Sequence, residues 1–352
     1  MRYSLFGESH GPAIGVVLQG VPSGLDIDEN FIRAEMARRA PGKSPLATAR
    51  NEKDEVRILS GVFEGKACGT PLCGVIENTD TRSRDYAATR WLARPGHADF
   101  TAHLRYHGFE DYRGGGHFSG RLTAPLVFAG AVAKLALRAR GVEVLARVKS
   151  IAGIDDAPLD LASPDVEALR AAGCKTLPVI DDARGEAMQQ AILDARGDGD
   201  SVGGLIQCFA LNVPAGLGSP DFDENIESLI ARHMFAVPAV KGLAFGAGFD
   251  FASMRGSEAN DSLTPGTPPR TRTNNNGGIN GGISNGMPVV FTVVIKPTPS
   301  IGKEQDTVNM NTSEAAKLTI TGRHDPCILS RAVPVIEAAC ALALTELPGV
   351  LA

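Results

Sequence analysis

Three stretches of the sequence combine titratable side chains with glycine, and each could bind or protonate an anionic ligand. The first is Gly7–Gly11, with the sequence GESHG. A histidine between small residues can be held against a ligand and can titrate near neutral pH. The alternative is a loop histidine whose ring is satisfied by other groups of the protein. His10 is therefore a candidate for proton transfer.

The second stretch is rich in arginine and has two parts, Arg94–Asp99 (RPGHAD) and Asp111–Arg121 (DYRGGGHFSGR). Three successive glycines followed by serine and arginine suit a cradle for an anion. Because guanidinium groups match phosphate and carboxylate groups, the local arginine excess predicts a site for a small polyanion. A solvated basic face is the alternative. The arginines of this region are Arg82, Arg84, Arg90, Arg94, Arg105, Arg113 and Arg121, and its acidic residues are Asp85, Asp99, Glu110 and Asp111.

The third stretch is Gly322–Pro326 (GRHDP), directly before the last expected helix. The N-terminal end of a helix favours anions. Lys296–Ser300 (KPTPS) follows an apolar strand and supplies another cation and hydroxyls, which we expect at the rim of a site. His97, His103 and His107 could suggest a metal, but no acidic residue has matching spacing, so we expect none.

The elements that must position these residues follow no regular βαβ order. Apolar runs predict strands, and capped patterns of helical period predict helices. Residues 78–120 show no regular pattern, and 265–276 form one long loop. The mixture predicts an α+β fold, and without a repeat or linker we expect 1–352 to be a single domain. The expected strands are 14–18, 56–59, 72–76, 142–151, 205–213 and 289–295, and the expected helices are 28–39, 126–140, 165–172, 184–195, 225–235 and 328–347.

The composition is that of an ordinary globular protein, with 43% hydrophobic and 21% charged residues. A net charge of -5 gives no general attraction to nucleic acid or to an anionic membrane. No stretch approaches the roughly 18 apolar residues expected of a membrane helix, and the N-terminus has no signal-peptide pattern. Six scattered cysteines without metal spacing predict reduced thiols and a cytoplasmic protein.

Together, these motifs resemble those of the chorismate synthase family. The N-terminal half carries GESHG (7–11), GVPSG (20–24), IENTD (76–80), RPGHAD (94–99) and DYRGGG (111–116). The C-terminal half carries KG (241–242), RGSE (255–258), NGGISNG (280–286), KPT (296–298) and GRHDP (322–326). The matches follow the family's order along nearly the whole chain.

The resemblance implies a β-α-β sandwich, with helices between two antiparallel sheets, assembled as a homotetramer. It implies conversion of 5-enolpyruvylshikimate 3-phosphate to chorismate by trans elimination of phosphate, in the shikimate pathway of aromatic amino acid biosynthesis. In the family, reduced FMN takes part and is not consumed overall. NADPH is a possible reductant, and an external flavin reductase is the expected partner.

The resemblance also implies roles for particular residues. His97 would protonate the departing phosphate, His10 would act near the pyrimidine edge of the flavin, and Asp325 would help the flavin N5 take the substrate proton. The residues that would hold substrate or NADP are Arg39, Arg94 and Arg121. The flavin contacts would be His117, Phe118, Ser119, Ala239, Gly281, Lys296, Pro297, Thr298, Pro299, Ser300 and Arg323.

The chain departs from the family at several of these positions. Residues 117–123 read HFSGRLT where the family often has RSSARET, although Ser119 and Arg121 are kept. Pro45 stands where many members have an arginine, and Pro238 where asparagine is common. A flavin oxidoreductase would instead show net electron transfer. A non-catalytic anion-binding protein would need the arginines, but not two histidines and an aspartate in matching contexts, which favours the enzyme.

Overall fold

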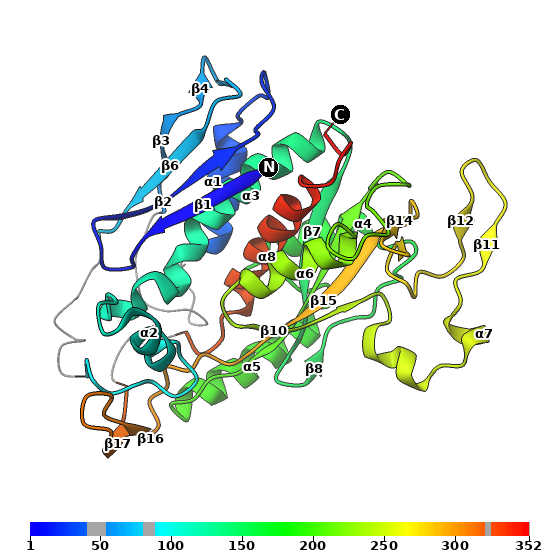
Figure 1. Cartoon of the computed structure of the whole chain (residues 1–352). Helices are drawn as coiled ribbons and strands as arrows, with labels where there is room; N and C mark the ends of the chain where they lie inside the picture. Colours follow the sequence, from blue (N-terminus) through cyan, green and yellow to red (C-terminus); the bar gives the residue numbers. More distant parts are fainter. Residues whose placement is uncertain (41–53, 80–88, 321–324, 352) are drawn as a thin grey trace.

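The computed structural model describes residues 1–40, 54–79, 89–320 and 325–351. Its first layer is an antiparallel sheet near the N-terminus (Figure 1), with strands in the order β1-β2-β6-β3. These strands are β1 (Arg2–Gly7), β2 (Ala13–Gln19), β6 (Leu72–Glu77) and β3 (Arg57–Ser60). The strands predicted at 14–18, 56–59 and 72–76 are therefore confirmed.

The second layer of strands is also antiparallel, in the order β10-β15-β9-β7-β8. Its strands are β10 (Val240–Phe245), β15 (Val289–Ile295), β9 (Gly204–Leu211), β7 (Glu143–Ile151) and β8 (Ile154–Asp155). β15 lies between two neighbours and is buried along most of its length, which explains its nearly continuous apolar sequence.

Four helices fill the space between the two sheets (Figure 1): α1 (Glu29–Arg39), α3 (Thr123–Arg138), α6 (Ile226–Ala236) and α8 (Leu329–Leu344). Helix α3 packs on β2 and β6, and α8 packs on β7 and β9. The two helices touch at Gly130, where an added Cβ would lie 2.1 Å from the Cβ of Ala338. The chain is thus an α+β protein with a β-α-β sandwich, as the resemblance implied.

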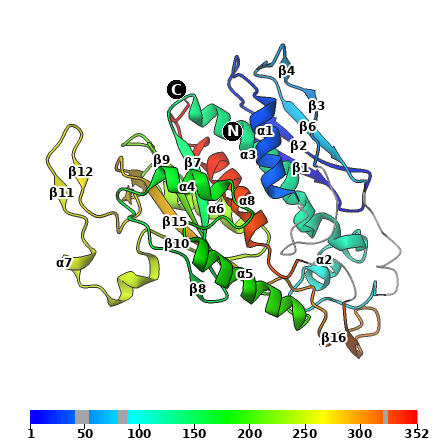
Figure 2. The same ribbon diagram turned by 180° about the vertical axis from the view of Figure 1, so that it is seen from behind.

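A further layer, which the sequence did not predict, lies on the outer face of the second sheet (Figure 2). It contains α4 (Val166–Gly173) and α5 (Asp182–Gly197), both of which contact β7. Leu169 of α4 packs against Phe209, Leu211 and Val290 in a separate small core. This cover explains why β9 and β15 are apolar on both faces.

Helix boundaries follow their capping residues. Asp28 accepts hydrogen bonds from the backbone N–H groups of Asn30 and Phe31, as predicted for the first helix. Asp165 and Asn225 cap α4 and α6 in the same way.

Two regions differ from the prediction. Residues 78–120, predicted to be irregular, contain α2 (Asp99–Tyr106) and two 3-10 turns, η2 (Arg113–Phe118) and η3 (Gly120–Leu122). Helix α2 has only eight residues, too few for its pattern to stand out from the irregular sequence around it. The predicted loop 265–276 contains β12 (Arg270–Thr271), which pairs with β11 (Leu263–Thr264). The remaining short elements are β4 (Val62–Phe63), β5 (Lys66–Ala67), η4 (Gly248–Ser253), α7 (Gly256–Ala259), β13 (Ile279–Asn280), β14 (Ile283–Ser284), β16 (Gln305–Val308) and β17 (Ala315–Leu318).

Within the described part of the chain, one helical segment, 120–138, is long and apolar enough to cross a membrane by length and composition, contrary to the sequence-based expectation. Of its apolar window, 83% is buried inside the molecule. The segment contains α3, which packs between the first sheet and α8. Burial in the core therefore accounts for its composition.

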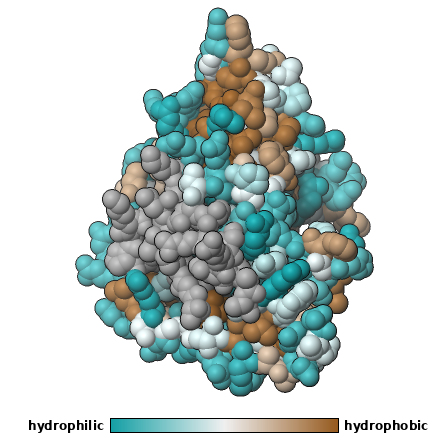
Figure 3. Space-filling model, turned by 90° about the vertical axis from the view of Figure 1, so that its left-hand side faces the viewer, coloured by the Kyte–Doolittle hydropathy of each residue, from teal (hydrophilic) through white to brown (hydrophobic). Residues whose placement is uncertain are grey.

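Apolar side chains that are exposed to solvent lie on the first sheet, at Phe6 and Leu59, and on the β4-β5 hairpin that follows β3, at Phe63. Figure 3 shows hydrophobic surface toward the top of the face that this sheet presents. Phe63 is 70% exposed, far more than a residue that serves the core of its own chain.

Candidate active site

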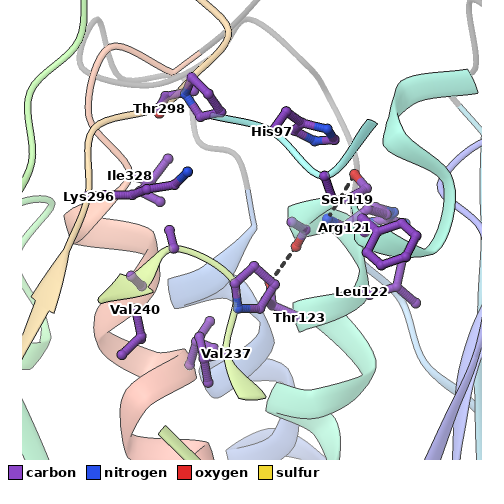
Figure 4. Close-up of a pocket in the computed structure, with 18 of the residues that line it drawn as sticks. His97, Ser119, Arg121, Leu122, Thr123, Val237, Val240, Lys296, Thr298 and Ile328 are labelled. Atoms are coloured by element: carbon purple, nitrogen blue, oxygen red, sulfur yellow. Dashed lines mark hydrogen bonds between the residues drawn. The ribbon is translucent and has the colours of Figure 1, made fainter. Parts of the chain in front are cut away.

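A cavity of about 760 Å³ lies where the C-terminal end of α1 meets the first turns of α3 and α8 (Figure 4). The loop before β10 and the segment after β15 complete its wall. This volume is in the upper part of the range of small-molecule sites. Of the three stretches that the sequence singled out, the second contributes residues from both of its parts, 94–99 and 111–121, and the third contributes Asp325. Residues of 296–300 also line the cavity, whereas residues 7–11 do not.

Among the described residues, six cations line the cavity and a single carboxylate, that of Asp325, opposes them. Arg39, Arg94 and Arg121 were predicted to bind anions, and Lys296 to contact a flavin. Lys241 and Arg331 were not assigned a role. The sequence did contain a sign of Arg331. It shares one face of the last helix with Ile328, Ala332 and Val335, and a cation on such an apolar face indicates a binding site. Such a concentration of positive charge in an acidic protein favours a polyanionic ligand.

His97 lies on the cavity wall with its ring held by a carboxylate. Its Nδ1 is 2.7 Å from Oδ1 of Asp99. Asp99 also accepts hydrogen bonds from Arg94, at 2.7 Å from both Nε and Nη2 and at 3.0 Å from the backbone N. Burial alone would raise the pKa of the Asp99 carboxyl, but the hydrogen bonds from Arg94 and His97 hold it well below its usual value. Asp99 is therefore ionised at any pH at which the protein would work.

The three glycines form a turn on which both candidate histidines rest. Gly114 and Gly115 have φ angles of 60° and 85°, which favour glycine. A Cβ at Gly114 would lie 2.5 Å from Cδ2 of His10, and a Cβ at Gly115 would lie 3.0 Å from Cε1 of His97. The turn thus leaves room for the imidazole rings, whether or not it also cradles an anion.

The structure separates the two histidines. His97 lines the cavity, whereas His10 is 8% exposed and lies behind Gly114, which itself lines the cavity. The loop of His10 is fixed to the glycine turn by Ser9, whose backbone N–H donates to the carbonyl of Gly116 at 3.1 Å. His103, considered above as a metal ligand, instead has its Nδ1 3.2 Å from a carboxylate oxygen of Glu110.

Most of the expected flavin contacts lie on the cavity wall. Gly281 belongs to the β13-β14 hairpin, which precedes β15, whereas Lys296 follows the other end of that strand. Gly281 and Pro297 are not among the described residues that line the cavity. Arg323 lies outside the described residues, as do Pro45 and the rest of 41–53. The expected contacts that line the cavity are His117, Phe118, Ser119, Ala239, Lys296, Thr298, Pro299 and Ser300.

The wall combines apolar and polar groups in a way that suits a flat ligand with polar edges. Val237, Ala239 and Val240 form an apolar side, and Lys296 and His97 project from other parts of the wall (Figure 4). The buried hydroxyl of Thr298 has no hydrogen-bond partner within the described chain. An orphaned hydroxyl in a cavity wall indicates a missing ligand partner.

Two further features concern the backbone and the charge of the cavity wall near Lys296. Ala239 has a φ of 71°, uncommon for a residue with a side chain, and its carbonyl accepts the backbone N–H of Lys296 at 3.0 Å. Burial, and then the charge of Lys241, lower the pKa of the Lys296 amine.

Comparisons with known proteins show which family the chain is similar to. The family model for chorismate synthase matches residues 1–348. The chain is 47% identical to the chorismate synthase of Aeropyrum pernix over 353 residues, covering 98% of this chain and 90% of that protein. It is 44% identical to that of Thermococcus kodakarensis, covering 98% and 95%. A crystal structure of a chorismate synthase superposes with a TM-score of 0.78 at 30% identity, covering 98% of this chain and 90% of the other.

The matches run through the first sheet, the glycine turn, the cavity wall and the last helix, so they include every element that builds the site. The chain therefore belongs to the chorismate synthase family, whose members are lyases that break a carbon–oxygen bond to phosphate.

Proposed function

We propose that this enzyme converts 5-enolpyruvylshikimate 3-phosphate to chorismate by trans elimination of phosphate, with reduced FMN and without net redox change. This reaction belongs to the shikimate pathway of aromatic amino acid biosynthesis. The observation that carries the proposal is the cavity, which six cations of the described residues line, with His97 on its wall. The substrate has a phosphate and two carboxylates, so it matches both the size and the charge of this site.

The flavin fits the cavity for two reasons stated above, its apolar wall and the unpartnered hydroxyl of Thr298. We propose that Phe118, Ala239, Lys296, Thr298 and Ser300 would hold it. The other proposed flavin contacts are His117, Ser119, Gly281, Pro297, Pro299 and Arg323. When bound, reduced flavin supplies electron density next to the substrate and is regenerated.

Residues of the chain are proposed to bind the anionic groups of the substrate and to transfer the protons of the elimination. Arg39, Arg94 and Arg121 are proposed to bind the phosphate and carboxylate groups, and the same arginines are the candidates for NADP. His97 is proposed to donate a proton to the phosphate oxygen as the carbon–oxygen bond breaks, because a protonated phosphate leaves more easily. Asp99 holds the imidazole for this transfer.

Two groups are proposed to act on the flavin side of the reaction. The Asp325 carboxylate, 2.6 Å from Nη1 of Arg331, is proposed to help remove the proton that the substrate loses. His10 is proposed to act from behind Gly114, against which its ring packs.

The molecule as a whole is proposed to be a single domain, 1–352, in a cytoplasmic homotetramer. One hydrophobic core includes residues of both sheets and of the helices between them. The exposed apolar side chains of the first sheet suit an interface between subunits. All six cysteines are free thiols, as in proteins of reducing compartments. We propose that an external reductase supplies the reduced flavin, with NADPH as a possible reductant.

An anaerobic assay with chemically reduced FMN and 5-enolpyruvylshikimate 3-phosphate tests the function. Chorismate is followed by its absorbance, phosphate by a colorimetric assay, and flavin oxidation by its visible spectrum. Since elimination is redox-neutral, each flavin should support release of many phosphates and should stay reduced. Oxidised FMN without a reductant is the control and should support no turnover.

Two outcomes would contradict the proposal in different ways. Release of one phosphate for each flavin oxidised would favour an oxidoreductase. Tight binding of the substrate without any chorismate, under conditions in which the protein is folded and reduced FMN is bound, would favour a protein that only binds small anions.

A further inference from the structure

Asp54 holds two arginines of the cavity wall with one carboxylate. Its side chain is fully buried, and Asp54 is not among the residues that line the cavity, whereas Arg39 and Arg121 are. Oδ2 accepts a hydrogen bond from Nη1 of Arg39 at 2.6 Å, and Oδ1 accepts one from Nη1 of Arg121. The carboxylate therefore lies behind the cationic wall and bridges its two guanidinium groups.

Further hydrogen bonds fix the direction of Arg39. Its Nε donates to Oγ1 of Thr123 and its Nη2 to the carbonyl of Gly120, both at 3.1 Å. Its own carbonyl accepts from Nε of Arg331 at 3.0 Å, and Arg331 pairs with Asp325. The position of Arg39 is thus coupled to the only carboxylate that the described cavity wall contains.

Hydrogen bonds also fix Arg121, and they connect it to the loop that carries His10. Its Nε donates to Oδ1 of Asn78 at 3.1 Å. The Nδ2 of Asn78 in turn donates to the carbonyls of Glu8 and Gly11, at 3.0 and 2.9 Å, which bracket His10. Asp54 is therefore at the centre of a network that reaches both ends of the site.

The charges of this group favour anion binding. Burial alone would raise the pKa of the Asp54 carboxyl, but Arg39 and Arg121 outweigh it and the pKa is lowered. Burial, opposed by Asp54, lowers the pKa of Arg39 to about 10, so both groups are charged at neutral pH. Two cations share one anion, and the group keeps a net positive charge toward the cavity.

The backbone at Asp54 is also constrained. Its φ angle of 50° lies in the left-handed region, which is unfavourable for a residue with a side chain. Aspartate tolerates this region better than most residues. Such a conformation persists where the surrounding contacts define it, here the two ion pairs.

We propose that Asp54 is a positioning residue of the anion site, which sets the spacing and direction of Arg39 and Arg121 for the ligand. The inference rests on the proposed function, in which these arginines bind substrate anions. A role in charge balance alone makes the opposite prediction. If Asp54 only neutralised the arginines, its removal would strengthen anion binding, because the site would gain a unit of positive charge.

The experiment measures binding of phosphoenolpyruvate, a small molecule with a phosphate and a carboxylate, by isothermal titration calorimetry at low ionic strength. Asp54→Asn should weaken binding by about tenfold or more, despite the lost negative charge, because an amide cannot accept from both guanidinium groups as a carboxylate does. The matched control is Asp156→Asn. Asp156 is a fully buried carboxylate 2.8 Å from Nη1 of Arg147, away from the cavity, and its variant should bind within twofold of the wild type.

Asp54→Glu keeps the charge, which guards against a variant that fails to fold, but moves the carboxylate by one methylene. Positioning predicts weaker binding in this variant too, whereas charge balance predicts wild-type binding. Unchanged or tighter binding in a folded Asp54→Asn protein, wild-type binding in Asp54→Glu, or no binding by the wild type would each overturn the inference. The assay needs no turnover. A protein that binds as predicted but forms no chorismate would contradict the proposed function and leave this inference standing.

Discussion

The tautomer of His97 follows from its two neighbours. A carboxylate only accepts hydrogen bonds and a guanidinium only donates them. Nδ1 of His97 is 2.7 Å from Oδ1 of Asp99 and 3.1 Å from Nη2 of Arg94, which already donates to that same oxygen. The shorter contact places the proton on Nδ1. Nε2 is then the atom through which the imidazolium can donate a proton to a ligand, as in other carboxylate–histidine pairs.

Asp99→Asn should change this tautomer. Two donors of Arg94, Nε and the backbone N, point at Oδ2, so the amide oxygen should face Arg94 and the amide NH₂ should face His97. Nδ1 must then accept, and the proton moves to Nε2. We expect kcat to fall on the order of 10²–10⁴-fold, the usual contribution of a positioned acid. Nitrogen-15 NMR of the histidine ring reports the tautomer directly.

The control for this variant is His107→Asn, at an exposed position with a φ of 56° that asparagine tolerates. It should leave both kcat and the NMR signals of His97 unchanged. A folded Asp99→Asn enzyme that keeps the Nδ1–H tautomer and nearly wild-type kcat would remove Asp99 from the mechanism.

Single residues could be predicted where they belong to a short motif of titratable residues and glycine. The motif RPGHAD indicated His97 and Arg94, and the structure places both on the cavity wall. Asp54 could not be found in this way. Its partners are 15 and 67 residues away along the chain, and a single aspartate before a strand carries no signal of the two arginines that it meets. Partners of this kind depend on tertiary packing.

The glycine turn shows how an element can control two side chains at once. Gly114 faces His10 and Gly115 faces His97, so the turn is a spacer between the rings. At Gly115 the nearest atoms to an added Cβ also include Nε2 of His97 at 3.2 Å and Nη2 of Arg94 at 3.4 Å. A methyl group there would press on the imidazole edge that we assign to proton donation.

Gly115→Ala should therefore lower kcat by about tenfold or more, since small displacements of a catalytic group are costly. Part of any effect would come from the φ of 85°, which disfavours alanine. Gly141→Ala controls for that part, because Gly141 has a φ of 78° but open space around its Cβ position. Steady-state kinetics and thermal unfolding of both variants are compared. Equal losses of stability with unchanged kcat in Gly115→Ala would show that the turn is only structural.

Elements were predictable where one face is buried and the ends are capped, as for α1 behind Asp28. Helix α2 was missed because its eight residues give barely two turns of pattern. The hairpin of β11 and β12 was missed because two-residue strands carry almost no pattern. In each case the element is too short for a helical or alternating pattern to be recognised in the sequence.

The order of the layers is a property of the whole molecule, and the apolar pattern of the elements does not reveal it. It came from the resemblance. The helices α4 and α5 were predicted, at 165–172 and 184–195, but their position on the outer face of the second sheet was not. One buried carboxylate joins elements of several layers. Glu337 of α8 accepts from Arg38 of α1 at 2.6 and 2.8 Å, from Lys134 of α3 at 2.5 Å, and from the backbone N–H of Ala146 in β7 at 2.8 Å.

Glu337→Gln should destabilise the fold by about 3–5 kcal/mol at pH 7, because the buried Lys134 and the half-buried Arg38 are left to share Glu35 as their one carboxylate, and the cluster keeps an uncompensated positive charge. Glu337 is 1% exposed, so water cannot replace the lost charge. Urea unfolding measures the change. Glu77→Gln is the control, since Glu77 and its partner Arg57 are both more than 65% exposed and 3.8 Å apart, and it should change the free energy of unfolding by less than about 1 kcal/mol.

The same group predicts how stability depends on pH. Burial would raise the pKa of Glu337, but Arg38 and Lys134 lower it from 4.5 to about 2. Because the folded pKa lies below the unfolded one, the carboxylate contributes stability that is fully present above about pH 4.5 and is lost as pH falls toward 2. The Glu337→Gln variant lacks this contribution, so its free energy of unfolding should fall less steeply than that of the wild type between pH 4.5 and 2. Parallel curves for the two proteins across this window would show that Glu337 is not ionised in the folded state, and that the layers are joined there by neutral hydrogen bonds.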